Sequence, residues 1–286
     1  MNSMSNKKYE ELTFIDDFMF CKVLVNNLNL CKGLLELILG IQIKRIVDVT
    51  KQKTIEITAD ARSVRLDVYV EDDEESVFDV EMQTTVKKDL PKRSRYYQGM
   101  IDLNLIEKGA KYGELKRSYV IFICMEDPFG RGLSVYTFEN RCKEASDLLL
   151  GDETVKVFIN VTGDTTGLSA EMKAFLEYLK DGNKDGSLFV TELEEQVQKA
   201  REHLEWRTEY MTLQMRYDEI AEEAMERGMQ QGLQRGLQQG LQQGIEQGIV
   251  EIIRKKLAKG MTVGEIADML EQTTDEVKRL IAAHEL

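Results

Sequence analysis

Two short segments of alternating apolar and polar residues, joined by an acidic turn, constrain this chain most. In residues 64–70 and again in residues 77–83 the even-numbered positions are apolar, and most odd-numbered positions are polar or amphipathic. An alternation of period two is typical of β-strands, and two such strands joined by a short turn predict a β-hairpin. The turn at residues 71–75 has no Gly or Asn, so its Asp residues must tolerate any positive φ that it needs.

One register of this hairpin satisfies both of its faces. If Asp67 lies opposite Glu81, then Val68 pairs with Val80, the apolar residues share one face, and the two acids share the other face with Gln83. Directly opposed side chains have Cβ atoms about 4.5–5.5 Å apart. Two carboxylates at that separation repel each other unless a cation lies between them or one of them binds a proton.

This juxtaposition predicts a metal site. Oxygen ligands with open coordination positions suit Mg²⁺ or Mn²⁺, so we expect Asp67 and Glu81 to bind such an ion. Gln83, two residues beyond Glu81 on the same face, could hold by hydrogen bonding a water that the ion activates. The alternation is also what a half-exposed strand without any site looks like, so at this point the site is a hypothesis.

A dense basic segment follows the hairpin. Pro91 is a favourable first-turn residue, and a helix that begins there directs its positive dipole end toward a phosphate. Lys and Arg contacts to phosphate supply most of the sequence-independent affinity for DNA. The alternative is an ordinary solvated helix terminus. We expect the DNA backbone to contact a set of basic residues and one aromatic residue: Lys87, Lys88, Lys92, Arg93, Arg95 and Tyr97.

Overall charge and residue types exclude several classes of protein. Lys and Arg total 38 against 51 Asp and Glu, a formal net charge of −13, which excludes a polycationic nucleic-acid coat. Only two histidines are present, so zinc hydrolases and Ser-His-Asp triads have almost no residues to be built from. The four cysteines lack zinc-ribbon spacing and are expected to be small core residues. No apolar run is long enough to span a bilayer, so we expect no membrane contact and a cytoplasmic location with reduced thiols.

The order of the expected elements indicates an α/β domain. Helical stretches alternate with strands as far as residue 182, and beyond it the strand pattern ceases. The expected helices are 13–39, 91–113 and 169–180, and the further strands are 118–125, 135–138 and 155–161. We expect four regions: an α/β domain at 1–182, a charged helical connector at 183–227, a glycine-repeat helix or linker at 228–250, and a small helical hairpin at 251–286.

The glycine repeat places Gly at every fourth position from Gly228 to Gly248, each followed by Met, Leu or Ile. A spacing of four advances about 40° around a helix at each step, and each Gly costs about 1 kcal/mol of helix stability relative to Ala. Close approach of a partner helix would compensate, so the repeat predicts self-association; a flexible polar linker is the alternative. Residues 262–282 are similar to a helix-turn-helix, but their nearly balanced charge favours a generic helical hairpin over a DNA-reading unit.

Taken in order, these segments resemble a known family. The run from Val64 to Val68, together with the run from Asp79 to Gln83, resembles the core motif of the PD-(D/E)XK nuclease superfamily, and more narrowly of the Rpn-type recombination-promoting nucleases and transposases. Further similarity lies in Asp17–Phe20, Arg95–Tyr97 with Asp102, Tyr119–Cys124 and Asp127–Phe129, so that the resemblance covers roughly residues 10–165.

The resemblance implies a restriction-endonuclease-like mixed sheet flanked by helices, with an all-helical C-terminal extension. It also implies that Asp67 and Glu81 bind the metal, that Asp17 is an accessory acid, and that Gln83 stands where the superfamily usually has Lys. The expected activity is metal-dependent hydrolysis of DNA phosphodiester bonds in recombination or transposition. Because Gln83 can orient a nucleophile but lacks the charge of Lys, a catalytically inactive DNA-binding or self-assembling scaffold is the alternative.

Overall fold

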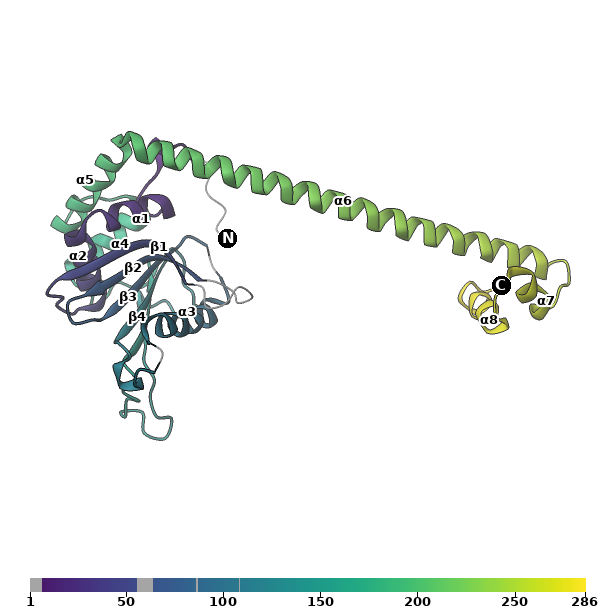
Figure 1. Ribbon diagram of the computed structural model, residues 1–286, viewed down its shortest axis with the longest axis horizontal. Helices are drawn as coiled ribbons and strands as arrows, with labels where there is room; N and C mark the ends of the chain where they lie inside the picture. The colour runs from purple at the N-terminus through teal and green to yellow at the C-terminus, as the bar shows by residue number, and fades with distance from the viewer. Residues whose placement is uncertain (1–6, 56–63, 86, 108) are drawn as a thin grey trace. The chain divides into compact units, whose positions relative to one another are not determined.

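The computed structural model describes residues 7–55, 64–85, 87–107 and 109–286. Within these ranges, six strands form one mixed sheet in the order β1-β2-β3-β4-β6-β5 (Figure 1). The β1-β2, β2-β3 and β5-β6 pairs are antiparallel, whereas β3-β4 and β4-β6 are parallel. The strands are β1 (Ile46–Ile55), β2 (Val64–Asp72), β3 (Val77–Gln83), β4 (Ser118–Cys124), β5 (Val135–Phe138) and β6 (Thr154–Asn160).

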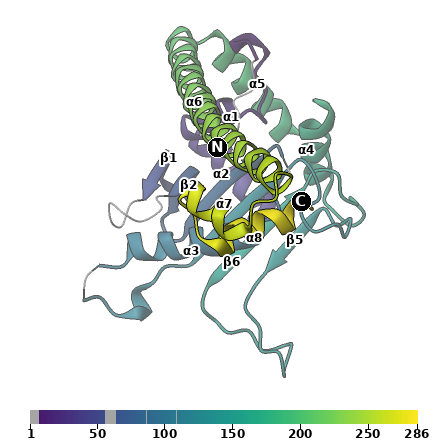
Figure 2. The same ribbon diagram turned by 90° about the vertical axis from the view of Figure 1, so that its right-hand side faces the viewer.

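Helices cover both faces of this sheet, as the sequence predicted. Helix α3 (Leu90–Leu105) lies on one face, and α1 (Asp17–Val25), α2 (Leu28–Leu39) and α4 (Ala170–Asp181) lie on the other (Figures 1 and 2). On the α3 side, Ile101 packs in a buried cluster with Tyr69, Phe122 and Phe158 from three strands. Every residue of β3 and β4 is buried, because these central strands are covered on both faces.

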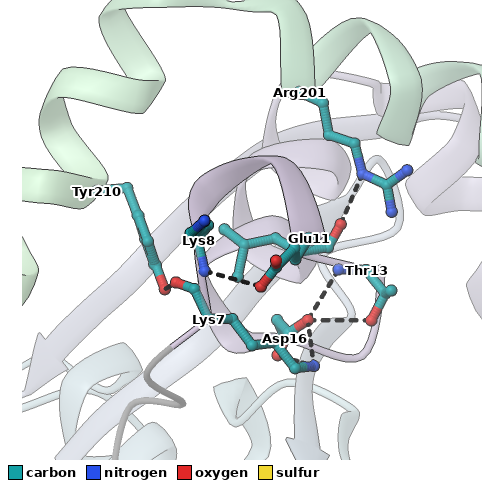
Figure 3. A network of polar contacts seen from close by, with 8 residues as sticks. Lys7, Lys8, Glu11, Thr13, Asp16, Arg201 and Tyr210 are labelled. Atoms are coloured by element: carbon teal, nitrogen blue, oxygen red, sulfur yellow. Dashed lines mark hydrogen bonds and ion pairs between the residues drawn. The ribbon is translucent and has the colours of Figure 1, made fainter.

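Polar contacts fix the segment that leads into α1. The Nε of Arg201 donates to the carbonyl of Leu12 at 2.7 Å, and the hydroxyl of Tyr210 donates to the carbonyl of Lys7 at 2.9 Å (Figure 3). The Asp16 carboxylate accepts the backbone N–H of Thr13 at 2.8 Å, and α1 begins at Asp17 rather than at residue 13, where the sequence predicted the helix to start. These contacts hold the start of α1, and with it the predicted accessory acid, over the sheet.

The first compact unit extends further than the sequence indicated. It ends at Thr212 rather than near residue 182. Helix α5 (Leu188–Glu202) belongs to it because the apolar stripe of α5, which includes Val190, Leu193 and Val197, is fully buried against α1, α2 and α4. The charged appearance of this segment comes from the opposite, exposed side of the helix.

The glycine repeat is helical in the structure. It lies inside α6 (Leu204–Leu257), a single helix of 54 residues. The residues between the glycines are mainly Gln, Leu, Met and Arg, which are strong helix formers and offset part of the glycine cost.

The second compact unit, Leu213–Leu286, has a small core of its own. Helices α7 (Val263–Leu270) and α8 (Thr274–Ala283) pack with the end of α6 around Ile253, Ile266 and Val277. Capping boxes at Thr262 and Thr273 begin the two short helices. None of the helices described in the structure combines the length and apolar content needed to cross a membrane.

The cysteines follow the core prediction with one exception. Cys21, Cys31 and Cys124 are buried with free thiols, whereas Cys142 is only half-buried in the loop after β5. Burial raises the pKa of the Cys31 thiol to about 12, which keeps it protonated and unreactive.

Candidate functional site

The β2-β3 hairpin has the predicted register. Val68 pairs with Val80 and Val70 with Phe78. In the turn, which contains no Gly, Glu75 adopts a positive φ of 63°. The Asp72 carboxylate accepts the N–H of Ser76 at 2.7 Å. Such a side-chain acceptor stabilises the tight turn in place of a favourable turn residue.

Asp67 and Glu81 lie next to each other where this ladder ends. The backbone N–H of Asp67 donates to Oε1 of Glu81 at 3.0 Å. Glu81 has no exposed surface, Gln83 is 3% exposed, and Asp67 is partly buried. The acid face of the hairpin is thus not solvated: Tyr69 shares it, and α3 covers it. A half-exposed strand without a site does not explain this burial, because the acids of such a strand would lie in water.

Arg93 of α3 reaches across to these side chains. Its Nη2 contacts Oε2 of Glu81 at 2.5 Å, its Nη1 donates to Oε1 of Gln83 at 3.1 Å, and its Nε donates to the hydroxyl of Tyr97 at 2.6 Å. The guanidinium carbon lies 4.9 Å from the centroid of the Tyr97 ring and 5.6 Å from that of Phe122. These contacts with three oxygens and two aromatic rings orient the planar guanidinium toward Glu81 and Gln83.

Asp17 joins the cluster from α1. The thiol of Cys21, one turn later on the same helix, lies 3.7 Å from Oδ1 of Asp17 and 3.4 Å from the carbonyl oxygen of Asp67. The charge of Asp17 contributes to raising the pKa values of both Asp67 and Glu81, so the three carboxyl groups are electrostatic neighbours. The structure therefore brings together the three acids that the sequence singled out.

A fourth acid, Asp79, was missed by the sequence reasoning. It is two residues before Glu81 on the same face of β3, it is opposite Tyr69, and it has no exposed surface. Neither of its carboxylate oxygens has a hydrogen-bond partner within the described parts of the chain. The signal was available, because Asp79 shares the odd-numbered parity of Asp67, Glu81 and Gln83.

The electrostatics of this cluster favour a cation. Burial is the largest cause that raises the pKa values of Asp67, Asp79 and Glu81 above the usual carboxyl range, and repulsion between neighbouring carboxylates raises them further. The positive charge of Arg93 opposes these shifts for all three acids. Several acids around one guanidinium leave negative charge that a second cation could neutralise.

The donor set fits a hard divalent cation. Among the residues described, no group of three or more His, Cys, Asp or Glu side chains is arranged as a metal site. The available donors are nonetheless carboxylate oxygens, which Mg²⁺ and Mn²⁺ prefer, and such ions often use only one or two protein carboxylates. The unpartnered oxygens of Asp79 show that the cluster has more acceptors than donors.

The predicted DNA-binding residues divide into two groups. Lys88, Lys92 and Arg95 are exposed around the start of α3, and Lys87 is half-buried. Arg93 and Tyr97 instead belong to the acid cluster, where the Tyr97 side chain is 7% exposed and has little surface to offer a nucleic acid.

Comparison with known proteins identifies the family. The model of a family described as PD-(D/E)XK nuclease family transposase matches residues 15–234. Searches of curated proteins and of solved structures found no significant match. The matched range holds α1, the β2-β3 hairpin and α3, which together form the acid cluster, and it covers more than half of the 286 residues. The chain therefore belongs to the PD-(D/E)XK nuclease family transposases.

Proposed function

We propose that this protein is a Mg²⁺- or Mn²⁺-dependent DNA endonuclease that acts in recombination or transposition. The observation that carries the proposal is the meeting of Asp67 and Glu81, from adjacent strands, in a sheltered cluster next to Arg93. The family gives a nuclease-type function related to transposition; the acid cluster supports the finer assignment to metal-assisted phosphodiester hydrolysis.

Each residue of the cluster has a role in this proposal. Asp67 and Glu81 would hold the ion, with Asp17 as an accessory acid. When bound, a divalent ion would lower the pKa of a water and neutralise charge on a phosphoryl oxygen. Gln83 would position the attacking water, since its amide oxygen has two lone pairs and Arg93 takes one of them. Arg93 supplies, beside Gln83, the positive charge that a Lys would carry at that position.

The DNA backbone would be held at the start of α3. Lys88, Lys92 and Arg95 are exposed there, within about two helical turns of Arg93, so a bound phosphate would lie near the acids. Because the chain as a whole carries a net charge of −13, the contact should be local and sensitive to salt.

We also propose that two copies of the protein associate through α6. Apolar side chains four residues apart are exposed along it, and apart from the adjacent backbone of the helix no atom of the described residues lies within 4 Å of a Cβ added at the neighbouring glycines. The exposed fractions fall from 75% at Met229 and Leu233 through 73% at Leu237 and 65% at Leu241 to 56% at Ile245. A second copy offers the same pattern, so small residues on one helix could accept large ones from the other. We place the protein in the cytoplasm, where its four free thiols would stay reduced.

Cleavage of plasmid DNA with Mg²⁺ or Mn²⁺ tests the nuclease. We expect Asp67→Asn and Glu81→Gln each to lower the cleavage rate at least about 100-fold, as expected when one charge-stabilising group is removed. Glu74→Gln, an exposed acid in the turn of the same hairpin, is the matched control and should cleave like the wild type. Wild-type protein that leaves the plasmid as intact as these variants do would contradict the endonuclease and favour the inactive scaffold.

The salt dependence of DNA binding tests the basic segment. The triple variant Lys88→Ala, Lys92→Ala and Arg95→Ala should flatten the slope of log K against log salt by about 0.9 for each phosphate that the variant no longer neutralises. Lys180→Ala, an exposed cation at the end of α4, is the control and should leave the slope unchanged. An unchanged slope in the triple variant would remove this surface from the proposal.

A further inference from the structure

Arg93 and the proposed metal compete for the same oxygen. Oε1 of Glu81 accepts the backbone N–H of Asp67, and Oε2 contacts the Arg93 guanidinium at 2.5 Å. Each carboxylate oxygen therefore already accepts one hydrogen bond, and the positive charge of Arg93 at Oε2 repels a divalent cation at the same oxygen, so that binding of an ion there favours withdrawal of Arg93. A guanidinium cannot lose its charge in a protein, so it needs another acceptor within the cluster.

Asp79 is suited to be that acceptor. It is on the same face of β3 as Glu81, at a separation of two residues, which corresponds to about 7 Å along a strand. It has no exposed surface, and both of its oxygens lack a hydrogen-bond partner among the described residues. The positive charge of Arg93 acts to lower the pKa of Asp79, so the two side chains interact electrostatically. A buried carboxyl group without a hydrogen-bond partner is rare, because buried polar atoms are nearly always hydrogen-bonded.

The surroundings of Arg93 allow a short movement. Its Nε and Nη1 donate to Tyr97 and Gln83, and because the guanidinium is rigid and planar, these two hydrogen bonds must shift with it when Nη2 turns from Glu81 toward Asp79. The aromatic rings of Tyr97 and Phe122 next to the guanidinium offer a surface without hydrogen-bonding groups of their own at the ring faces. The guanidinium can therefore exchange one carboxylate for another while staying beside Gln83.

We propose that Arg93 exchanges between Glu81 and Asp79: it closes Glu81 in the metal-free protein, and Asp79 receives it when a divalent cation binds to Glu81. Asp79 is then a positioning residue, which acts through Arg93. This inference rests on the proposed metal-binding function of Asp67 and Glu81. It accounts for the unpartnered acid and for the location of Arg93 away from the basic surface.

Calorimetric titration of the full chain with MnCl₂ tests the exchange without measuring cleavage. Four proteins are compared: wild type, Asp79→Asn, Arg93→Met and the double variant. We expect Asp79→Asn to weaken Mn²⁺ binding about tenfold, because Arg93 then has no charged acceptor to move to, and to change it less than about twofold when Arg93 is already Met. A weakening of equal size in both backgrounds, or none in either, would overturn the exchange.

A second variant tests the proposal even if Asp79→Asn does not fold. Arg93→Gln keeps a polar side chain near Tyr97 and lacks the competing charge, so it should bind Mn²⁺ at least as tightly as the wild type. Weaker binding by Arg93→Gln would overturn the proposal. Fluorescence of Trp206, which lies in the first compact unit, checks that each variant is folded.

The same titration separates this inference from the proposed nuclease. Coupled Mn²⁺ binding in a protein that does not cut plasmid DNA would support the exchange and contradict the nuclease. Plasmid cleavage without coupling between Asp79 and Arg93 would support the nuclease and overturn the exchange. Wild-type protein that does not bind Mn²⁺ would overturn both.

Discussion

The acid cluster and the glycine-containing part of α6 depart from the usual distribution of side chains in opposite ways. In the cluster, the acids Asp79 and Glu81 have no exposed surface. Along α6, the apolar side chains of Leu233, Leu237 and Leu241 are 65–75% exposed. Buried acids cost stability unless a partner compensates their charge, and rows of exposed large apolar side chains mark surfaces that bind a partner. The first departure therefore points to a bound cation, and the second to a bound protein surface.

The two regions should differ most in the free energy of unfolding that is lost when one apolar side chain is truncated in each. Phe122 has no exposed surface and stacks on Phe158 with ring centroids 5.3 Å apart. We expect Phe122→Ala to lower the free energy of unfolding by about 3–5 kcal/mol, because it leaves a cavity beneath Arg93. Leu237→Ala in dilute protein should change it by less than about 0.5 kcal/mol. Urea unfolding followed by circular dichroism and by Trp206 fluorescence measures both.

Equal losses in the two variants would contradict the comparison, because Leu237 would then be covered within its own chain. Phe158→Leu is a useful control for the first region. It keeps most of the buried volume and should cost less than Phe122→Ala.

The contrast also shows which features the sequence could predict. The hairpin register followed from period two alone, since a shift by one residue would have moved Val68 and Val80 to the face of the acids. The enclosure of that face did not follow, because it depends on where α3 packs. The i, i+4 spacing of Arg93 and Tyr97 placed both on one side of α3, but only the fold shows that this side meets Glu81 rather than solvent.

The extension of the first compact unit beyond residue 182 has a similar reason. Helix α5 is rich in charge, yet Leu193 and Val197 bury one side of it completely. Composition averages the two sides of a helix, whereas packing depends on one of them. The glycine repeat, for which the sequence left a helix and a linker open, lies in a helix, and the helix formers between the glycines offset part of the glycine cost.

Charges placed on the exposed row of α6 should disrupt self-association. Burying two Leu side chains in an interface contributes about 1.5–3 kcal/mol each, so Leu233→Glu with Leu237→Glu should weaken association at least about 100-fold. Sedimentation velocity should then give the 32.9 kDa monomer. Gln234→Glu with Gln238→Glu adds the same charge at neighbouring positions and is the control. A wild type that sediments as a monomer at high concentration would remove α6 from the proposed assembly.

Alanine in place of glycine separates two effects of the glycines in α6: their cost to helix stability and their role in the approach of a second helix. Gly236→Ala and Gly240→Ala should each stabilise the helix by about 1 kcal/mol, since among the described residues only the adjacent helix backbone lies within 4 Å of the added Cβ. If the glycines admit a second helix, the same variants should weaken association while helicity rises. Circular dichroism would then show higher helicity, and sedimentation would show weaker association. A rise in both would contradict close approach at these glycines.

The smallest expected effect concerns an acid that, unlike Glu81, remains partly exposed. Glu209 accepts from Lys22 at 2.5 Å and from Lys51 at 2.9 Å, and its side chain is 41% exposed. Burial alone would raise the pKa of Glu209, but the hydrogen bonds from the two lysines outweigh it and lower the pKa. A lowered carboxyl pKa stabilises the folded state above the unfolded pKa of about 4.3, and this contribution is lost as the pH falls through the folded pKa.

Glu209→Gln should therefore cost less than about 1 kcal/mol at pH 7, because solvent screens a pair this exposed, and the difference from wild type should close below about pH 4. Urea unfolding at both pH values measures it through Trp206, since the Nζ of Lys22 lies 5.2 Å from that ring. A difference that persists at low pH would assign the loss to packing rather than to charge. The buried acids of the cluster should behave oppositely, because their raised pKa values make the folded state less stable as the pH rises through them.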